Sequence, residues 1–207
     1  MDEKITTVLD IYHERIRRER DEPPEMPPRG RDGGQDQRMR AVGPNTGQLI
    51  NILARSLKAP TILELGTSFG YSGIWLGEAA RASGGRLITM ELHDYKSAFA
   101  REMAARAGLA DAIDFRVGDA VRMIGELQTG LDFVLVDLWK ELYVPCLEAF
   151  YPRLNPGAII VADNMLGPDP NVKVYGRAVR AKAGITSVLL PVGAGIEVSR
   201  FEPAAGA

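Results

Sequence analysis

The feature that most constrains this chain is an alternation of short apolar segments with helical patterns, which begins after Ala59. Strands that alternate with helices form a parallel sheet with helices on both faces, so we predict a doubly wound α/β fold. The expected strands are 61–65, 86–92, 112–117, 132–137, 158–163, 186–192 and 195–201. The expected helices lie around 72–82, 94–107, 120–128, 141–151 and 172–182.

The connection between the last two expected strands is a short turn that contains Gly193 and Gly195. A parallel connection needs a crossover, usually a helix, and this turn is too short to hold one. We therefore predict that the final two strands form an antiparallel hairpin.

The first 37 residues differ in pattern from the rest. Apolar residues at helical spacing predict an amphipathic helix that ends at Pro23. The segment 21–37 is rich in Pro, Gly and charge and is expected to be a mobile loop, either a lid over a binding site or a plain linker. We divide the chain into this N-terminal helix and loop (1–37) and a main domain (38–207).

Charge and cysteine content exclude several classes of protein. Lys and Arg number 25 against 27 Asp and Glu, which gives a net charge of −2 and no basic footprint for nucleic acid. The single cysteine, Cys146, excludes an internal disulfide framework and fits a reducing compartment. With no signal-peptide pattern and no run near the roughly 20 apolar residues that span a bilayer, we expect a cytoplasmic protein without a membrane partner.

A glycine-containing loop joins the first expected strand to its helix and holds Glu64, Gly66, Gly70, Tyr71 and Ser72. Ligands of open α/β sheets bind at the carboxyl ends of the strands. The glycine spacing is wrong for a dinucleotide, and a carboxylate would repel its phosphates. The carboxylate of Glu64 would suit a ligand that carries a positive charge, such as an amino acid or a sulfonium. The alternative is a tight turn with no ligand.

Two further acidic residues follow strands at this edge. Glu91 closes the second strand, where a carboxylate can accept both hydroxyls of a ribose. The alternative is a solvated carboxylate at a strand end. Asp119, after the third strand, either accepts from the amino group of an adenine or caps the next helix, and the two roles can coexist.

Three oxygen-bearing side chains follow the next two strands. Asp137 ends the fourth strand, and Asp163 and Asn164 end the fifth. Neighbouring strands lie about 5 Å apart, so these oxygens can converge on one hard cation such as Mg²⁺, Mn²⁺ or Ca²⁺. Any one of these residues taken alone is better explained as a cap of a turn or helix, which is a common role at strand ends.

Lys140 stands three positions after Asp137, with Trp139 before it. A lysine near a dication and a sulfonium has its charged form disfavoured and can accept a proton from a substrate hydroxyl. The alternative is an exposed loop lysine. Trp139 either walls the cofactor pocket or belongs to the core.

Four motifs in order resemble one known family. They are ELGTSFGYS (64–72), MEL with Glu91, DLWKELYVP (137–145) and VADNM (161–165). Together they resemble the class I S-adenosylmethionine-dependent O-methyltransferases of the catechol and caffeoyl-CoA group. The resemblance implies a Rossmann-like, seven-stranded sheet with its last strand antiparallel, and it makes 38–207 a methyltransferase domain.

The same resemblance implies roles for individual residues. Asp137, Asp163 and Asn164 carry over as metal ligands and Lys140 as the general base. The residues that carry over to the S-adenosylmethionine site are Val42 through its backbone, Glu64, Gly66, Tyr71, Ser72 and Glu91. The sequence departs from the catechol enzymes at Leu138, which replaces a histidine, and at Arg38, Met39 and Arg40, which replace a tryptophan. A late glutamate that contacts substrate has no counterpart, because Glu197 lies in a strand pattern.

These observations lead to one hypothesis and three rivals. We expect an enzyme that moves a methyl group from S-adenosylmethionine to a hydroxyl of a small catechol-like diol chelated by Mg²⁺ or a similar cation. The rivals are a metal-independent or nitrogen-directed methyltransferase of the same fold, a nucleotide-binding oxidoreductase, and a catalytically silent cofactor-binding module. The expected partner is a small hydroxylated acceptor, with a homodimer as an open expectation.

Overall fold

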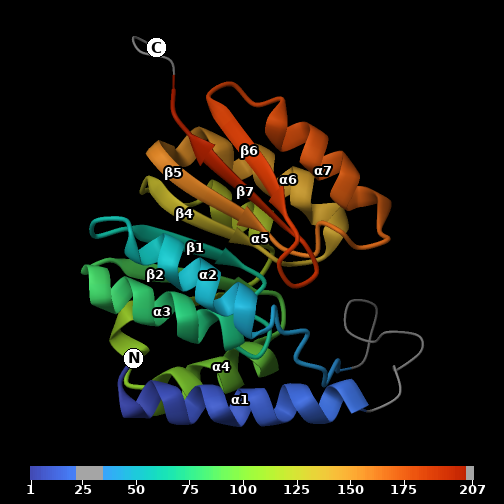
Figure 1. The fold of residues 1–207 in the computed structure, drawn as a ribbon. Helices are drawn as coiled ribbons and strands as arrows, with labels where there is room; N and C mark the ends of the chain where they lie inside the picture. Colours follow the sequence, from blue (N-terminus) through green and yellow to red (C-terminus); the bar gives the residue numbers. More distant parts are fainter. Residues whose placement is uncertain (22–34, 204–207) are drawn as a thin grey trace.

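The computed structural model describes residues 1–21 and 35–203, and its centre is a seven-stranded sheet (Figure 1). The strand order is β3-β2-β1-β4-β5-β7-β6, with a crossover between β1 and β4 at the middle of the sheet. The strands are β1 (Thr61–Leu65), β2 (Arg86–Glu91), β3 (Ile113–Val117), β4 (Leu131–Val136), β5 (Leu154–Ala162), β6 (Ile185–Leu190) and β7 (Ile196–Phe201). The predicted doubly wound sheet is confirmed.

Strand direction follows the sequence prediction. The strands β3, β2, β1, β4 and β5 pair in parallel, and β7 pairs antiparallel with both β5 and β6. The predicted terminal hairpin is therefore confirmed. In the parallel half, Val136 of β4 pairs with Ala162 of β5, so the residues that follow these two strands begin side by side.

Helices cover both faces of the sheet, as predicted. Buried apolar side chains of α1, α2, α3 and α4 form a core on one face, and those of α5, α6 and α7 form a core on the other. The helices are α1 (Glu3–Asp21), α2 (Pro44–Arg55), α3 (Tyr71–Ser83), α4 (Asp94–Arg106), α5 (Ala120–Gly125), α6 (Tyr143–Phe150) and α7 (Pro170–Arg180). Short 3₁₀ helices are η1 (Ala110–Ala112), η2 (Lys140–Leu142) and η3 (Tyr151–Arg153).

The helix α2 was not predicted. It begins at Pro44, directly after Gly43 with a φ of 83°. Proline is favoured in the first turn of a helix because its missing N–H has no partner there in any case. Its buried Ile50 and Ala54 have helical spacing, and Asn51 donates to the carbonyl oxygen of Trp75 in α3 at 2.8 Å. The Gly43–Pro44 start and the apolar spacing could have been recognised in the sequence.

The N-terminal helix α1 shares the core of the main domain. Its residues Ile5, Val8 and Tyr12 are buried, and the Tyr12 hydroxyl donates to the carbonyl oxygen of Phe69 at 2.6 Å. Tyr12 therefore ties α1 to the loop that leads into α3. The predicted mobile loop lies mainly at 22–34, which is outside the described residues, so the lid stays a prediction.

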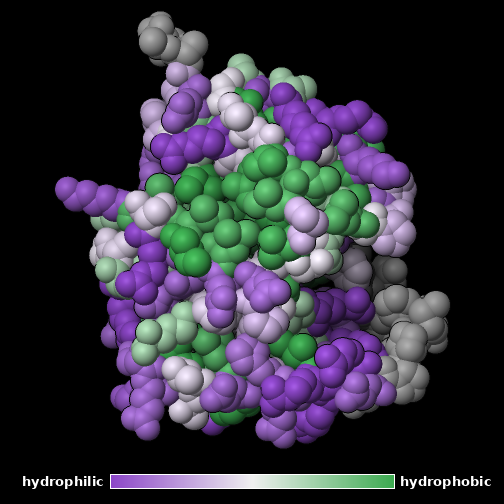
Figure 2. All heavy atoms as spheres, in the orientation of Figure 1, coloured by the Kyte–Doolittle hydropathy of each residue, from purple (hydrophilic) through white to green (hydrophobic). Residues whose placement is uncertain are grey.

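Much of the surface over β5, β7 and β6 in the view of Figure 2 is hydrophobic. On the elements near it, Val188 of β6 and Ile52 of α2 are exposed. Figure 1 shows no helix in front of these strands.

Within residues 1–21 and 35–203, no helix combines the length and the apolar character needed to cross a membrane.

Candidate active site

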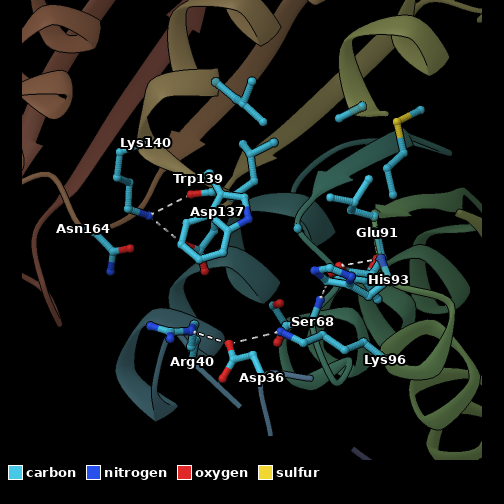
Figure 3. Close-up of a pocket in the computed structure, with 18 of the residues that line it drawn as sticks. Asp36, Arg40, Ser68, Glu91, His93, Lys96, Asp137, Trp139, Lys140 and Asn164 are labelled. Atoms are coloured by element: carbon cyan, nitrogen blue, oxygen red, sulfur yellow. Dashed lines mark hydrogen bonds and ion pairs between the residues drawn. The ribbon is translucent and has the colours of Figure 1, made fainter. Parts of the chain in front are cut away.

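A cavity of about 560 Å³ opens at the carboxyl ends of the parallel strands (Figure 3). This size is ordinary for a small-molecule site. Nine residues of the predicted site line it: Gly66, Tyr71, Ser72, Glu91, Asp119, Asp137, Trp139, Lys140 and Asn164. The remaining four, Val42, Glu64, Gly70 and Asp163, are not among its lining residues. The fold thus gathers residues from five different strand ends around one cavity.

The loop after β1 is shaped by two glycines with positive φ. Gly66 has a φ of 98°, and a Cβ there would collide with the carbonyl oxygen of Asp137. Gly70 has a φ of 91°, and a Cβ there would stand 2.7 Å from the Cβ of Ala100. Both positions need glycine for its backbone freedom and for its missing side chain. Gly66 therefore allows the first and fourth strand ends to meet closely.

Glu64 lies in β1, is fully buried and is not among the residues that line the cavity. The Thr89 hydroxyl donates to its Oε2 at 2.5 Å, while its Oε1 has no partner among the described residues. Burial raises the pKa of Glu64 to about 7, against the opposing effect of hydrogen bonds from Ser72 and Thr89. The unpartnered oxygen leaves Glu64 able to accept one more hydrogen bond.

Glu91 ends β2 and anchors two loops at the side of the pocket (Figure 3). The backbone N–H of Ser68 donates to its Oε2 at 2.8 Å, and the backbone N–H of His93 donates to its Oε1 at 3.1 Å. A carboxylate has about four acceptor sites, so Glu91 retains capacity for a pair of hydroxyls. Its orientation is already fixed by the two backbone donors.

Asp119 faces the same pocket and also caps α5. Its Oδ1 accepts from the backbone N–H of Arg122 at 2.8 Å. An aspartate in this position satisfies a free N–H at the helix start. The capping role was one of the two foreseen for Asp119, and the contact with an adenine stays a prediction.

The predicted metal ligands lie at two adjacent strand ends. Asp137 follows β4 and Asp163 follows β5, and the backbone N–H of Asp163 donates to the carbonyl oxygen of Val136 at 3.1 Å. The side-chain amide of Asn164 donates to Asp163 Oδ2 at 3.2 Å, and Asn164 has a left-handed φ of 60°. No cluster of three His, Cys, Asp or Glu side chains suited to a metal occurs in the described parts of the chain. The predicted set has only two carboxylates, with the amide as third.

The surroundings of Asp137 and Asp163 disfavour the charged forms of both side chains. Burial and the charge of Asp137 raise the pKa of Asp163 to about 7. Burial also raises the pKa of Asp137, although the Lys140 ammonium opposes this shift. Asp163 Oδ1 is buried without a hydrogen-bond partner among the described residues. A buried carboxylate with an unpartnered oxygen, next to a second carboxylate that is only 13% exposed, is an environment that a hard cation would stabilise.

Lys140 lies at the start of η2, and its Nζ is held by three acceptors. It donates to Asp137 Oδ1 at 3.3 Å, to the Leu138 carbonyl oxygen at 3.1 Å and to the Tyr143 hydroxyl at 2.7 Å. The Tyr143 hydroxyl in turn donates to the carbonyl oxygen of Asp163 at 3.0 Å. The lysine therefore borders the pocket in a fixed position beside both aspartates, and it is not the freely exposed loop lysine of the alternative hypothesis.

The segment just before α2 lines the pocket in a different way from that expected. Val42 is not a lining residue, whereas Met39, Arg40 and Ala41 are. The Arg40 guanidinium lies over the ring of Trp139, 5.9 Å from its centroid, and Trp139 borders the cavity. Trp139 is thus a wall of the pocket.

Most of the other lining residues could not be predicted, because no local sequence signal marks them. Asp36 and Lys96 line the cavity and pair with each other at 3.3 Å, although 60 positions separate them in the chain. Asp169, the N-cap of α7, lines it as well. Only Asp169 carried a local signal, an aspartate before a proline at a helix start.

Fold and site together define a class. A doubly wound sheet with a switch in strand order at β1 and β4, and a polar pocket at the carboxyl ends there, is the architecture of Rossmann-like ligand-binding enzymes. The family model described as O-methyltransferase matches residues 34–200. The chain belongs to the O-methyltransferase family.

Comparisons with individual proteins agree with the family. The chain is 36% identical over 130 residues to the catechol O-methyltransferase of Niastella koreensis, covering 61% of this chain and 58% of that protein. It is 28% identical over 177 residues to caffeoyl-CoA O-methyltransferase 1 of Eucalyptus globulus, covering 74% and 72%. The chain thus spans less than two thirds of the Niastella relative.

Solved structures show the same fold over nearly the whole chain. The O-methyltransferase from Bacillus cereus in complex with SAH gives a TM-score of 0.77 at 23% identity, covering 98% of this chain and 92% of that one. The O-methyltransferase TomG from Streptomyces achromogenes in complex with SAM gives a TM-score of 0.76 at 26% identity, covering 98% and 91%. The Rossmann-like fold predicted from the sequence is confirmed.

Proposed function

We propose that this protein is an S-adenosylmethionine-dependent O-methyltransferase. It transfers the methyl group to one hydroxyl of a small catechol-like diol. A hard divalent cation, Mg²⁺ or a similar ion, is held by Asp137, Asp163 and Asn164, and Lys140 is the general base.

The orphaned Oδ1 of Asp163 beside Asp137 is the observation that carries this proposal. An unpaired buried carboxylate oxygen is costly, and a second carboxylate next to it increases the cost. A cation bound between the two carboxylates would relieve both costs. The three proposed ligands offer only oxygen atoms, which Mg²⁺, Mn²⁺ and Ca²⁺ prefer. Zinc and copper prefer thiolate or imidazole ligands, so they fit this site less well.

Lys140 is suited to accept the proton of the acceptor hydroxyl. When bound, a dication at the aspartates lowers the pKa of a hydroxyl group next to it. Lys140 Nζ donates to Asp137 Oδ1 at 3.3 Å, so the lysine is held next to the proposed cation site. Nζ then takes the proton, and the acceptor oxygen takes the methyl group from the sulfonium. The products are a methyl ether and S-adenosylhomocysteine.

The rest of the pocket provides groups for the methyl donor. Glu91, with acceptor capacity left after binding two backbone amides, would hold the ribose hydroxyls. Asp119 would accept from the adenine amino group. Glu64, through its unpartnered Oε1, and Ser72 at the start of α3 would serve the amino-acid end. The SAH and SAM complexes of the structural neighbours support this choice of ligand.

The acceptor class follows from the relatives and from the donor set. Catechol and caffeoyl-CoA O-methyltransferases are both among the similar proteins. Asp137, Asp163 and Asn164 would supply three oxygens to the cation, and two oxygens of a vicinal diol could complete its ligands. A small hydroxylated aromatic acceptor therefore fits this pocket better than a macromolecule.

A methyl-transfer assay tests the proposal. The protein is incubated with S-adenosylmethionine carrying a radiolabelled methyl group and a panel of diols, with Mg²⁺ or with a chelator. We expect label in the ether product of at least one diol, and loss of most of that activity with the chelator. Each diol is matched by its mono-hydroxy analogue as a control. Equal turnover of a diol and its analogue in the presence of chelator would refute the metal-assisted reaction.

A further inference from the structure

Arg40 brings a positive charge into the acceptor side of the pocket. Its side chain is 44% exposed, lines the cavity and lies over the ring of Trp139. In Figure 3 it lies below Trp139 on the same side as Lys140 and Asn164, away from Glu91. The guanidinium is therefore near the proposed acceptor and not near the proposed ribose site.

A buried carboxylate fixes the position of this guanidinium. Asp36 is fully buried, and its Oδ2 accepts from Arg40 Nε at 2.7 Å and from Lys96 Nζ at 3.3 Å. Its Oδ1 accepts from the backbone N–H of Arg38 at 3.1 Å. One carboxylate faces two cations, so a positive charge is left in excess in this cluster.

The donor groups of Arg40 are divided between the protein and the cavity. Only Nε binds Asp36, and in residues 1–21 and 35–203 no hydrogen bond is found for its Nη1 and Nη2 groups. A guanidinium with one anchored edge and free Nη groups can bind a carboxylate. The ring of Trp139 provides a flat surface against which such a ligand would lie.

The backbone of Arg40 is held in an unusual conformation. Its φ is 48°, in the left-handed region that non-glycine residues rarely adopt. The flanking Met39 donates its N–H to the Glu19 carboxylate of α1 at 2.9 Å, and the Met39 carbonyl oxygen accepts from the Ser68 hydroxyl at 2.8 Å. Hydrogen bonds to two separate segments, α1 and the loop after β1, thus hold a backbone conformation that is locally unfavourable, a situation common at ligand sites.

We propose that Arg40 is a specificity-determining residue that binds an anionic substituent of the acceptor, and that the preferred acceptors are diols with a carboxylate on the ring. This inference rests on the proposed function, because it assumes that the acceptor lies between Trp139 and Lys140. A lysine in the place of Arg40 would retain the charge but lose the forked geometry. Arg40 and Trp139 together distinguish charged acceptors from neutral ones of the same shape.

The test uses two compounds of almost equal shape, 3,4-dihydroxybenzoate and its neutral amide, 3,4-dihydroxybenzamide. Binding of each is measured by calorimetry to protein loaded with S-adenosylhomocysteine and Mg²⁺, and kcat/KM is measured with S-adenosylmethionine. The variants are Arg40→Met, Arg40→Lys and, as a matched control on the same segment, Arg38→Met.

We expect wild-type protein to bind the benzoate about 10-fold or more tightly than the amide. Arg40→Met is expected to weaken benzoate binding and kcat/KM by about 10- to 100-fold and to leave the amide within about threefold. Arg40→Lys should retain part of the preference, and Arg38→Met all of it.

The outcomes separate this inference from the proposed function. If Arg40→Met weakens binding of the benzoate and of the amide equally, only the anion subsite is overturned. The same holds if wild-type protein methylates the amide and binds the two compounds equally well. Arg40-dependent binding of the benzoate without methyl transfer to any diol would support the subsite and overturn the proposed reaction. If neither compound binds to the loaded protein, both are wrong.

Discussion

The ammonium of Lys140 donates to the hydroxyl of Tyr143 across 2.7 Å, from a 3₁₀ turn to the helix that follows it. The same hydroxyl donates its own hydrogen bond to the carbonyl oxygen of Asp163, directly after β5. The proposed base is therefore oriented by a side chain that bridges the two strand ends of the proposed metal site.

Replacing Lys140 tests its role as a base. Lys140→Met is expected to lower kcat by about 10²- to 10⁴-fold while KM and the affinity for S-adenosylhomocysteine change little. Lys140→Arg should be equally inactive, because a guanidinium does not lose its proton. Lys182→Met serves as the control, because Lys182 pairs with Glu148 and is not among the residues that line the cavity. Full activity of Lys140→Arg would show that the position needs only a positive charge.

A double-mutant cycle tests the contact between Glu91 and the ribose. Glu91→Ala is expected to weaken binding of 5′-methylthioadenosine by about 10- to 100-fold, because a hydrogen bond to a charged group is lost at each hydroxyl. For the 2′,3′-dideoxy analogue the same substitution should cost much less. Calorimetric affinities for both ligands and both proteins give the coupling. A cycle with no coupling would assign Glu91 only to holding the N–H groups of Ser68 and His93.

The close approach at Gly66 predicts a loss of stability. Gly66→Ala places a methyl group against the carbonyl oxygen of Asp137 at a φ of 98°, so we expect the free energy of unfolding to fall by about 2 kcal/mol or more. Gly125→Ala is the control, since a Cβ there meets nothing within 4 Å, and it should be neutral or stabilise by up to about 1 kcal/mol. Urea unfolding measures both. Equal stability of the two variants would contradict the close contact between the first and fourth strand ends.

The raised pKa of Glu64 predicts a pH dependence of stability. Its folded value is about 7, against an ordinary 4.5, because the side chain is buried. Between these pH values the folded protein keeps a proton that the unfolded chain releases, so stability falls as pH rises from 4.5 to 7. Glu64→Gln should remove this contribution, on the order of 3 kcal/mol.

Ligand-free wild-type and Glu64→Gln proteins are therefore compared by urea unfolding at pH 5 and at pH 8. The free energy of unfolding of Glu64→Gln, relative to that of wild type, should be higher at pH 8 than at pH 5. Glu102→Gln, on the exposed face of α4, should differ from wild type by the same small amount at both pH values. A gap between Glu64→Gln and wild type that does not change with pH would contradict a protonated Glu64.

The sheet and the acidic side of the site could be predicted because their signals are local. Buried parallel strands appear as short apolar runs, and the carboxyl ends of such strands meet at one edge of the sheet. Glu91, Asp137 and Asn164 each follow or end a strand, so their place around one pocket followed from the strand assignment alone.

The opposite wall of the pocket could not be predicted in this way. Asp36, Arg40 and Lys96 meet only after α4 packs near the segment before α2, and no periodicity encodes a pairing across 60 positions. Glu64 shows a different limit. The motif placed it beside the ligand; the fold buries its side chain completely, and it is not among the residues that line the cavity.

The central claim is that Asp137, Asp163 and Asn164 hold one hard cation next to Lys140, and Mn²⁺ binding tests it most directly. Electron paramagnetic resonance of Mn²⁺ titrated into protein loaded with S-adenosylhomocysteine counts the bound ions. We predict about one tightly bound Mn²⁺ in wild-type and Lys140→Met proteins, and loss of that ion in Asp163→Asn. Unchanged Mn²⁺ binding in Asp163→Asn, or no tight binding in the wild type, would contradict the account.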